Sequence, residues 1–187
     1  MFSLASLTVA CILGVAAATP FARQSAMCNP NLEGAGVSII TPGDTEWYVS
    51  PVVAGTALKK DGGGFPPNAT AEWHVEQTGS ANPTTYIVKA ISNNGLVADV
   101  VNGQLTLEEI DSSKQSQLWE INCKQCFSGA SSTPGGGEFA VGCLIKSVPT
   151  GLCATLEMGS EFLGLGECDN EHPVVAETFN FWTATNA

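Results

Sequence analysis

From Gly36 onward the chain consists of short apolar runs separated by turn residues. The runs are rich in valine, isoleucine, threonine and tryptophan, and glycine, proline or asparagine interrupts them about every 8 to 12 residues. This spacing predicts an all-β barrel or sandwich, because strands that alternate with helices are separated by longer periodic segments. The one candidate for a helical turn, 109–115, lacks an apolar stripe long enough to dock. We therefore predict an all-β fold with almost no helix.

A strand that closes on a tryptophan recurs along the chain. The copies read Ala-Glu-Trp-His-Val around Trp73, Gln-Leu-Trp-Glu-Ile around Trp119 and Asn-Phe-Trp-Thr-Ala around Trp182. Repetition with a period of about 45 to 60 residues indicates one supersecondary unit used several times, because a single unit cannot bury its own apolar face. We therefore predict three structural repeats.

Each repeat is expected to contain four strands. The expected strands are 37–40, 46–49, 56–58 and 72–75 in the first repeat, 86–91, 96–101, 104–110 and 117–121 in the second, and 143–148, 151–156, 162–168 and 179–182 in the third. A turn is expected at 93–95, and Asn102-Gly103 predicts a two-residue hairpin turn, because both residues tolerate positive φ. The glycine-rich segment 131–137 is expected to be a long surface loop, because only one further repeat follows it.

The N-terminus predicts export from the cell. The apolar run 4–15 and the small residues at 16–18 are typical of a signal peptide, which we place at 1–18. An arm at 19–35 without clear periodicity and a single domain at 36–187 follow. No later stretch approaches the roughly 20 apolar residues that a transmembrane helix needs. We therefore expect a secreted, extracellular protein.

The cysteines favour disulfide bonds over metal or redox chemistry. Removal of the signal peptide takes Cys11 away and leaves six cysteines, and an even number in an oxidising compartment favours three disulfides. Cys123 and Cys126 have the spacing of a zinc pair or a redox motif. A zinc site would need a second pair, and a redox site would need a helix N-terminus to lower the thiol pKa. Neither is visible, so we expect no metal site and no cofactor.

Charge and the scarcity of nucleophile motifs restrict the function further. The net charge is −11, with Arg23 the only arginine, so we expect neither nucleic acid nor membrane as a partner. The only histidines, His74 and His172, have no serine or cysteine nucleophile motif nearby. The acidic neighbours Glu108 and Glu109 would point to opposite faces of a strand, unlike a glycosidase pair. We therefore expect a protein that is not an enzyme.

One N-glycosylation sequon is present. Asn68-Ala-Thr lies beside runs of glycine and proline, which predict an exposed loop, and such a loop is what the attachment of a glycan at Asn68 requires.

Several of these motifs occur together in one known family. The three strands that close on tryptophan, the Gly-Leu-x-x-Asp-Val segment ending at Val100 and the Gln-x-Trp ending at Trp119 resemble the ricin-B-type β-trefoil lectins over about 36–184. The resemblance implies a β-trefoil of three four-stranded pseudo-repeats, in which six strands form a barrel and three hairpins cap it. It also implies that Trp73, Trp119 and Trp182 pack in a shared core.

The resemblance extends to one disulfide. In the family, a cysteine two places after the glycine of Gly-Leu bonds to one that ends the next strand, and Cys153 and Cys168 occupy those positions. A closed loop of this length contributes about 3 kcal/mol. The pairing of the other cysteines stays open among three possibilities; these cysteines are Cys28, Cys123, Cys126 and Cys143.

The resemblance also implies where a sugar would bind. The galactose-type site of the family uses an aspartate on the second strand, an aromatic ring on the third and an asparagine before the glutamine of Gln-x-Trp. In the second repeat, Asp99 fits the first role, whereas Glu108 stands at the aromatic position and Ser116 at the asparagine position. With Asn102 and Gln117, these residues predict a half-built carbohydrate site.

The other repeats match the family's site less well. Thr155 and Gly166 replace the acid and the ring in the third repeat, so no site of the family's type is expected there. In the first repeat no acid falls in register near Tyr48, although Trp47 or Tyr48 could offer a ring.

Two functions follow from the sequence. The first is a secreted, non-enzymatic lectin-like β-trefoil that recognises glycans or glycoproteins weakly through the second repeat. The alternative is a trefoil that has lost sugar binding and binds a protease or another protein through the loops at 62–68 and 131–137. Trefoil protease inhibitors act in the second way.

Overall fold

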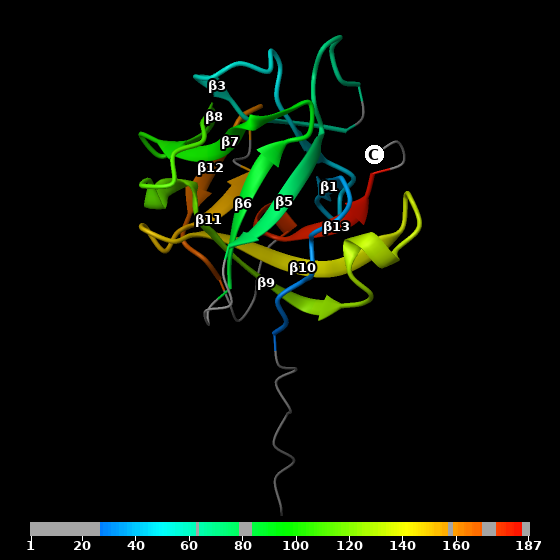
Figure 1. Cartoon of the computed structure of the whole chain (residues 1–187). Coiled ribbons are helices and arrows are strands. Elements are labelled where there is room, and N and C mark those ends of the chain that lie inside the picture. The colour runs from blue at the N-terminus through cyan, green and yellow to red at the C-terminus, as the bar shows by residue number, and fades with distance from the viewer. Residues whose placement is uncertain (1–26, 63, 79–83, 157–158, 170–174, 185–187) are drawn as a thin grey trace, which may run out of the picture.

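The fold is all-β (Figure 1), and the computed structural model describes residues 27–62, 64–78, 84–156, 159–169 and 175–184. The predicted signal peptide, 1–18, lies outside these residues. The strands are β1 (Val37–Ile40), β2 (Glu46–Tyr48), β3 (Thr56–Ala57), β4 (Lys59–Asp61), β5 (Glu72–Thr78), β6 (Thr85–Ala90), β7 (Asn93–Val101), β8 (Gln104–Glu109), β9 (Trp119–Cys126), β10 (Glu138–Ser147), β11 (Cys153–Leu156), β12 (Leu163–Gly166) and β13 (Phe179–Thr183).

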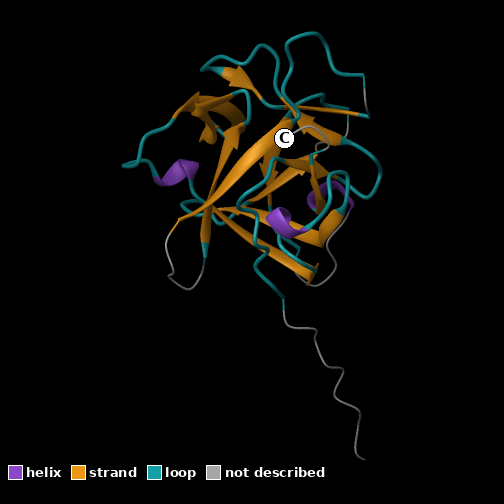
Figure 2. Cartoon of the chain, turned by 45° about the vertical axis from the view of Figure 1, so that its right-hand side comes forward, coloured by secondary structure: helices purple, strands orange, loops and turns teal. Residues whose placement is uncertain are grey.

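Helix is almost absent from the described residues, as predicted. It consists of three single 3₁₀ turns, shown in purple in Figure 2, and these are η1 (Gln115–Gln117), η2 (Ala130–Ser132) and η3 (Val175–Glu177). None of the helices in these ranges is long and apolar enough to cross a membrane.

Six strands form a closed ring. β1 pairs with β5, β5 with β6, β6 with β9, β9 with β10, β10 with β13, and β13 returns to β1, always antiparallel. The hairpins β2–β4, β7–β8 and β11–β12 stand apart from this ring, and neighbouring hairpins touch at Gly164↔Gln104 and at Lys59↔Phe162. A six-stranded barrel with three hairpins is consistent with the β-trefoil that the sequence resembles.

The strand register shows a threefold repetition. Trp73 on β5 lies opposite Val37, Trp119 on β9 lies opposite Tyr86, and Phe179 on β13 lies opposite Cys143. Trp73, Trp119 and Phe179 are all completely buried. They are therefore the three equivalent core positions of the repeats.

The core prediction is right for Trp73 and Trp119 and wrong for Trp182. Trp182 is only half-buried, whereas Phe179 and Phe181 are completely buried. Side chains alternate between the two faces of a strand, so Trp182 lies on the outer face with Asn180. The buried Trp47 ring, on β2, makes a T-shaped contact with Phe179 at 5.2 Å between centroids.

The disulfides join Cys28 to Cys126, Cys123 to Cys143 and Cys153 to Cys168. The third pairing is the one that the resemblance implied, and the first two resolve the open choice. Cys123 and Cys126 have different partners, so each of them belongs to a separate disulfide.

Residues 27–36 form an arm that lies against the barrel. Cys28 exchanges two backbone hydrogen bonds with Cys123, at 2.8 and 2.9 Å, and the buried Tyr86 hydroxyl donates to the Pro30 carbonyl at 2.9 Å. Burial, with the nearby charge of Glu33 as a smaller cause, raises the pKa of Tyr86 to about 12. The arm is thus tied to the second repeat by covalent and hydrogen bonds.

The turns follow the sequence in part. Asn102 and Gly103 have φ of 53° and 80° and join β7 to β8 as the predicted two-residue turn. β7 already begins at Asn93, so the turn expected at 93–95 lies at 91–92. The segment 131–137 is a surface connection, but Gly136 donates a backbone hydrogen bond to Thr183 at 2.8 Å, which holds it to the body.

Candidate functional site

In the second repeat, Gln117 connects the β7–β8 hairpin to the start of β9. Its Nε2 donates to Asp99 Oδ2 at 3.1 Å and to the Glu109 carbonyl at 2.9 Å, and its Oε1 accepts from the Asp111 backbone N–H at 2.8 Å. Gln117 is 1% exposed and Asp99 2%. The glutamine of the Gln-x-Trp motif therefore holds the repeat closed.

The remaining bonds of Asp99 also lie within the protein. Its Oδ1 accepts from the Val100 backbone N–H at 2.6 Å, and Lys114 Nζ lies 3.7 Å from Oδ2. Little carboxylate surface is left for a ligand hydroxyl unless Lys114, whose side chain is half exposed, moves away.

The other predicted site residues lie around this pair in different ways. Ser116 is half-buried on η1, next to Gln117. Asn102 is exposed in the β7–β8 turn, at the opposite end of the hairpin from Glu109, and within the described chain no hydrogen bond joins it to Asp99 or Gln117. The structure thus brings together Asp99 and Gln117 with Ser116 beside them, and leaves Asn102 apart.

The register identifies the equivalents of Asp99 in the other repeats. β2, β7 and β11 pair with the preceding barrel strand at Glu46, Val97 and Cys153 respectively. The residues two places further on are therefore equivalent, and they are Tyr48, Asp99 and Thr155. The family's acid is absent from the first and third repeats, as the sequence indicated.

The first repeat contains a groove of about 330 Å³, which we call the first-repeat groove. Its lining includes Ser38, Glu46, Phe65, Thr70 and Glu72. The Phe65 ring is half-buried and packs at a tilt on Tyr48, with 5.3 Å between centroids. The groove therefore combines an aromatic ring with carboxylates and hydroxyls.

The polar groups of this groove come from adjacent strands. In the sheet Ser38 lies opposite Glu72, while Glu46 lies opposite Ile40. Burial raises the pKa of Glu46, a hydrogen bond from Ser38 opposes that rise, and the charge of Glu72 adds to it. Two carboxyl groups thus line the groove, and that of Glu46 is partly desolvated.

The sequence did not predict this groove. It offered Trp47 and Tyr48 as rings, but Trp47 is completely buried and Tyr48 is 7% exposed, so neither presents an open face. Phe65 lies in a glycine- and proline-rich loop, whose path could not be predicted from the sequence, so its proximity to Glu46 was not expected. The nearby sequon is the one local signal of an exposed loop.

In the described chain, no group of three or more histidine, cysteine, aspartate or glutamate side chains is arranged to hold a metal ion. His172 lies outside these residues.

Comparison with known proteins supports the fold. No family model and no curated protein matches the sequence. Among solved structures, Cry35Ab1 is 13% identical with a TM-score of 0.60, over 83% of this chain and 36% of that one. The designed three-fold symmetric protein ThreeFoil is 11% identical with a TM-score of 0.56, over 79% of this chain and 97% of that one.

A lectin is among the similar structures. The Polyporus squamosus lectin, solved with the epitope Neu5Aca2-6Galb1-4GlcNAc, is 19% identical with a TM-score of 0.53, over 81% of this chain and 50% of that one. The chain thus spans about a third of Cry35Ab1 and half of the lectin. At these identities the likeness establishes a shared fold alone, and the match to a three-fold symmetric protein is consistent with the expected β-trefoil.

Proposed function

We propose that this chain is a secreted, non-enzymatic carbohydrate-binding protein of the ricin-B-type β-trefoil class, which recognises glycans weakly. The observation that carries the proposal is the first-repeat groove, in which the Phe65 ring lies beside the Glu46 and Glu72 carboxyl groups. The fold shared with a lectin supports the class of ligand. The three disulfides support an extracellular location.

The chemistry of the groove suits a sugar ring. The apolar face of a pyranose stacks on an aromatic ring, and its hydroxyls donate to carboxylates and exchange hydrogen bonds with Ser38 and Thr70. A single stacking contact and a few hydrogen bonds, each worth only about 1 kcal/mol net, leave little free energy of binding once the cost of association is met. Weak recognition is therefore the expected outcome.

The second repeat provides a rival position for the same function. The sequence predicts that Asp99, Asn102, Ser116 and Gln117 contact the sugar, and this remains a prediction. Such a site would require Lys114 to leave Asp99 and would lack an aromatic wall from its own hairpin, where Glu108 stands instead. We therefore expect binding in the first-repeat groove to be the stronger of the two.

Titration of the mature chain with galactose, N-acetylgalactosamine and cell-wall oligosaccharides, after a glycan array, tests the proposal. Phe65→Ala should weaken binding about five- to tenfold, because loss of the stacking contact costs about 1 to 1.4 kcal/mol. Phe127→Ala is the matched control, because Phe127 is a 51% exposed phenylalanine outside the groove. Asp99→Asn tests the second repeat. Absence of binding, or binding that neither Phe65→Ala nor Asp99→Asn weakens, would remove the proposal.

A glycan at Asn68 would stand at the edge of this groove. Asn68 is exposed with a φ of 63°, and it lies between Phe65 and Thr70, which both line the groove. We expect the secreted protein to carry the glycan and to bind sugars more tightly after enzymatic removal of it. Equal affinity before and after removal would show that the glycan does not shield Phe65.

The alternative, protein binding through loops, gains no support from the loop at 131–137. Thr183 holds this segment from both sides, because its hydroxyl donates to the Pro134 carbonyl and its backbone N–H to Gly137. These bonds hold the loop in one conformation, and because preorganised loops also bind proteases, they favour neither function. Inhibition of a serine or cysteine protease by micromolar protein would favour the alternative.

A further inference from the structure

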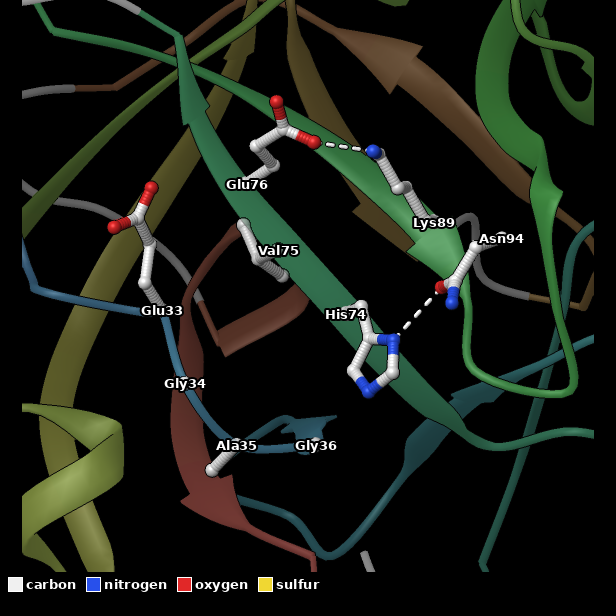
Figure 3. A pocket seen from close by; sticks show the side chains of 9 residues that line it. All are labelled: Glu33, Gly34, Ala35, Gly36, His74, Val75, Glu76, Lys89 and Asn94. Atoms are coloured by element: carbon white, nitrogen blue, oxygen red, sulfur yellow. Dashed lines mark hydrogen bonds and ion pairs between the residues drawn. The ribbon is translucent and has the colours of Figure 1, made fainter.

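A second groove, of about 560 Å³, lies along β5 (Figure 3). The arm segment 33–36 forms one side of it, and residues of β5 with Lys89 and Asn94 form the other. β5 pairs with β6 from Trp73 to Thr78, but with β1 only through two residue pairs, at its beginning. Val75 and Glu76 line the groove, Val75 with only 3% of its surface exposed, and Gln77 follows them on the strand; we call 75–77 the β5 edge.

The threefold repetition shows how the equivalent edges are closed. Gln77, Cys123 and Thr183 are equivalent, because each lies four residues beyond a core aromatic of its repeat. Cys123 exchanges two backbone hydrogen bonds with Cys28 of the arm. Thr183 donates its N–H to Gly137 at 2.9 Å and accepts from Gly136 at 2.8 Å. In these two repeats, a further backbone segment completes the sheet.

At the β5 edge, a side chain takes the place of that backbone segment. The Gln77 N–H donates to Glu33 Oε1 at 3.1 Å. Successive residues of a strand direct their backbone groups to opposite sides, so the N–H and C=O of Val75 and the C=O of Gln77 face the same way. Among the described residues, no backbone segment hydrogen-bonds to these three groups.

The groups around the groove favour a positively charged occupant. Glu33 and Glu76 contribute two carboxylates, whereas Lys89, paired with Glu76, contributes one ammonium group, and the whole chain carries −11. At one end, His74 Nδ1 and Asn94 Oδ1 are 2.7 Å apart, and a dashed line marks this contact in Figure 3. The lining includes no phenylalanine, tyrosine or tryptophan on which a sugar ring could stack.

We propose that the β5 edge binds an extended, basic peptide segment of another protein, which adds a strand to β5. A carbonyl of the peptide accepts the Gln77 N–H in place of Glu33, and the peptide exchanges hydrogen bonds with Val75. The released Glu33 carboxylate then pairs with a lysine or arginine of the peptide. In this mode of recognition, backbone hydrogen bonds provide the affinity and alternate side chains the specificity.

The test uses the mature chain with its disulfides intact and an acetylated, amidated heptapeptide of alternating valine and lysine. Titration followed by NMR should shift the amide signals of Val75 and Gln77 and slow hydrogen exchange at Val75. A peptide with proline at the alternate positions whose N–H groups face β5 should bind at least tenfold more weakly, because proline has no N–H to donate.

Charge variants separate this site from general electrostatic attraction. Glu33→Lys should weaken binding of the valine–lysine peptide at least tenfold, and Glu33 is exposed, so the variant should fold. Glu109→Lys is the matched control, because Glu109 is also exposed and lies outside the groove; it should leave binding unchanged. Phe65→Ala should also leave it unchanged, which keeps the result independent of the proposed glycan site.

Several results would overturn the proposal. These are absence of binding at millimolar peptide, equal binding of the proline peptide, and binding that Glu33→Lys does not weaken. Slow exchange at Val75 in the free monomer would show that the chain already fills the edge itself. Shifts of the same amides on raising protein concentration would identify a second copy as the occupant, and shifts on adding saccharides would identify a sugar.

Discussion

Gln117 matches a position of the family motif, and its role in this chain is structural. Its amide joins Asp99, Glu109 and Asp111, and it is almost completely buried. Glu177 is its equivalent in the third repeat and accepts a similar backbone hydrogen bond, from Asp169 at 3.3 Å. Both residues precede the core aromatic by two positions and hold the loop before it.

Replacement of Gln117 should therefore destabilise the fold whether or not a sugar binds. Gln117→Ala removes the acceptor of the Asp111 N–H and one donor to the buried Asp99 carboxylate, and we expect a loss of about 2 to 4 kcal/mol in the free energy of unfolding. Urea denaturation of the wild type and the variant measures the loss. Glu177→Ala, at a half-buried position, should cost less than half as much; equal losses would contradict this account.

Glu46 should make the stability depend on pH. Its pKa in the folded chain is raised, chiefly by burial, above the ordinary value of 4.5, so the folded state holds the proton more tightly than the unfolded state does. The free energy of unfolding should therefore fall as the pH rises from 4.5 through the raised pKa, as far as this group determines it.

Glu46→Gln removes this titration. The free energy of unfolding of the variant minus that of the wild type should be larger at pH 8 than at pH 4, because only the wild type has to bury a charge at the higher pH. Thermal unfolding at the two pH values measures the difference. A stability difference that is the same at both would mean that Glu46 is not desolvated in the folded chain.

Among the strands, β13 shows most clearly what the sequence could and could not predict. The expected strand 179–182 is present, and it closes the third repeat as predicted. The prediction of which face of β13 is buried was wrong, because both faces carry aromatic rings. Phe179 and Phe181 lie on the buried face, and Trp182 lies on the other. A pattern of apolar residues does not show which of two aromatic faces is buried. Alignment of the repeats on Trp182 also missed that η3 precedes β13 as η1 precedes β9.

Substitutions in β13 test this assignment. Phe179→Ala should lower the free energy of unfolding by about 3 to 5 kcal/mol, because it empties a core position. Trp182→Ala should cost about 1.5 kcal/mol or less, because Trp182 is only half-buried, although its side chain is the larger one. Urea titrations of both variants provide the comparison. A larger loss for Trp182→Ala would restore the indole to the core.

The grooves were beyond the reach of the sequence because each one joins distant segments. The first-repeat groove combines β1, β2, the residues before β5 and the first residue of β5, and the groove at the β5 edge combines the arm with β5, β6 and β7. By contrast, Asp99 and Gln117 stand at motif positions with a recognisable spacing, and the structure brings them together. Local motifs were therefore predictable, and surfaces assembled between elements were not.

At the scale of the whole molecule, the arm breaks the threefold repetition. Cys28 completes the sheet beside β9 and is bonded to Cys126 across 98 residues of sequence, whereas Cys153 and Cys168 are 15 residues apart. In the chain-entropy account, a disulfide stabilises by restricting the unfolded state, and the restriction grows with the length of the closed loop. The arm bond should therefore be the more important of the two.

Paired serine substitutions test this ranking. Cys28→Ser with Cys126→Ser should lower the free energy of unfolding by about 4.7 kcal/mol, whereas Cys153→Ser with Cys168→Ser should lower it by about 3 kcal/mol. Loss of the arm bond should also speed hydrogen exchange at the Cys123 amide, which Cys28 covers, and leave the Thr183 amide unchanged. If the two pairs cost the same, or if exchange at Cys123 stays slow, the hydrogen bonds of Cys28 and Tyr86 hold the arm without the disulfide.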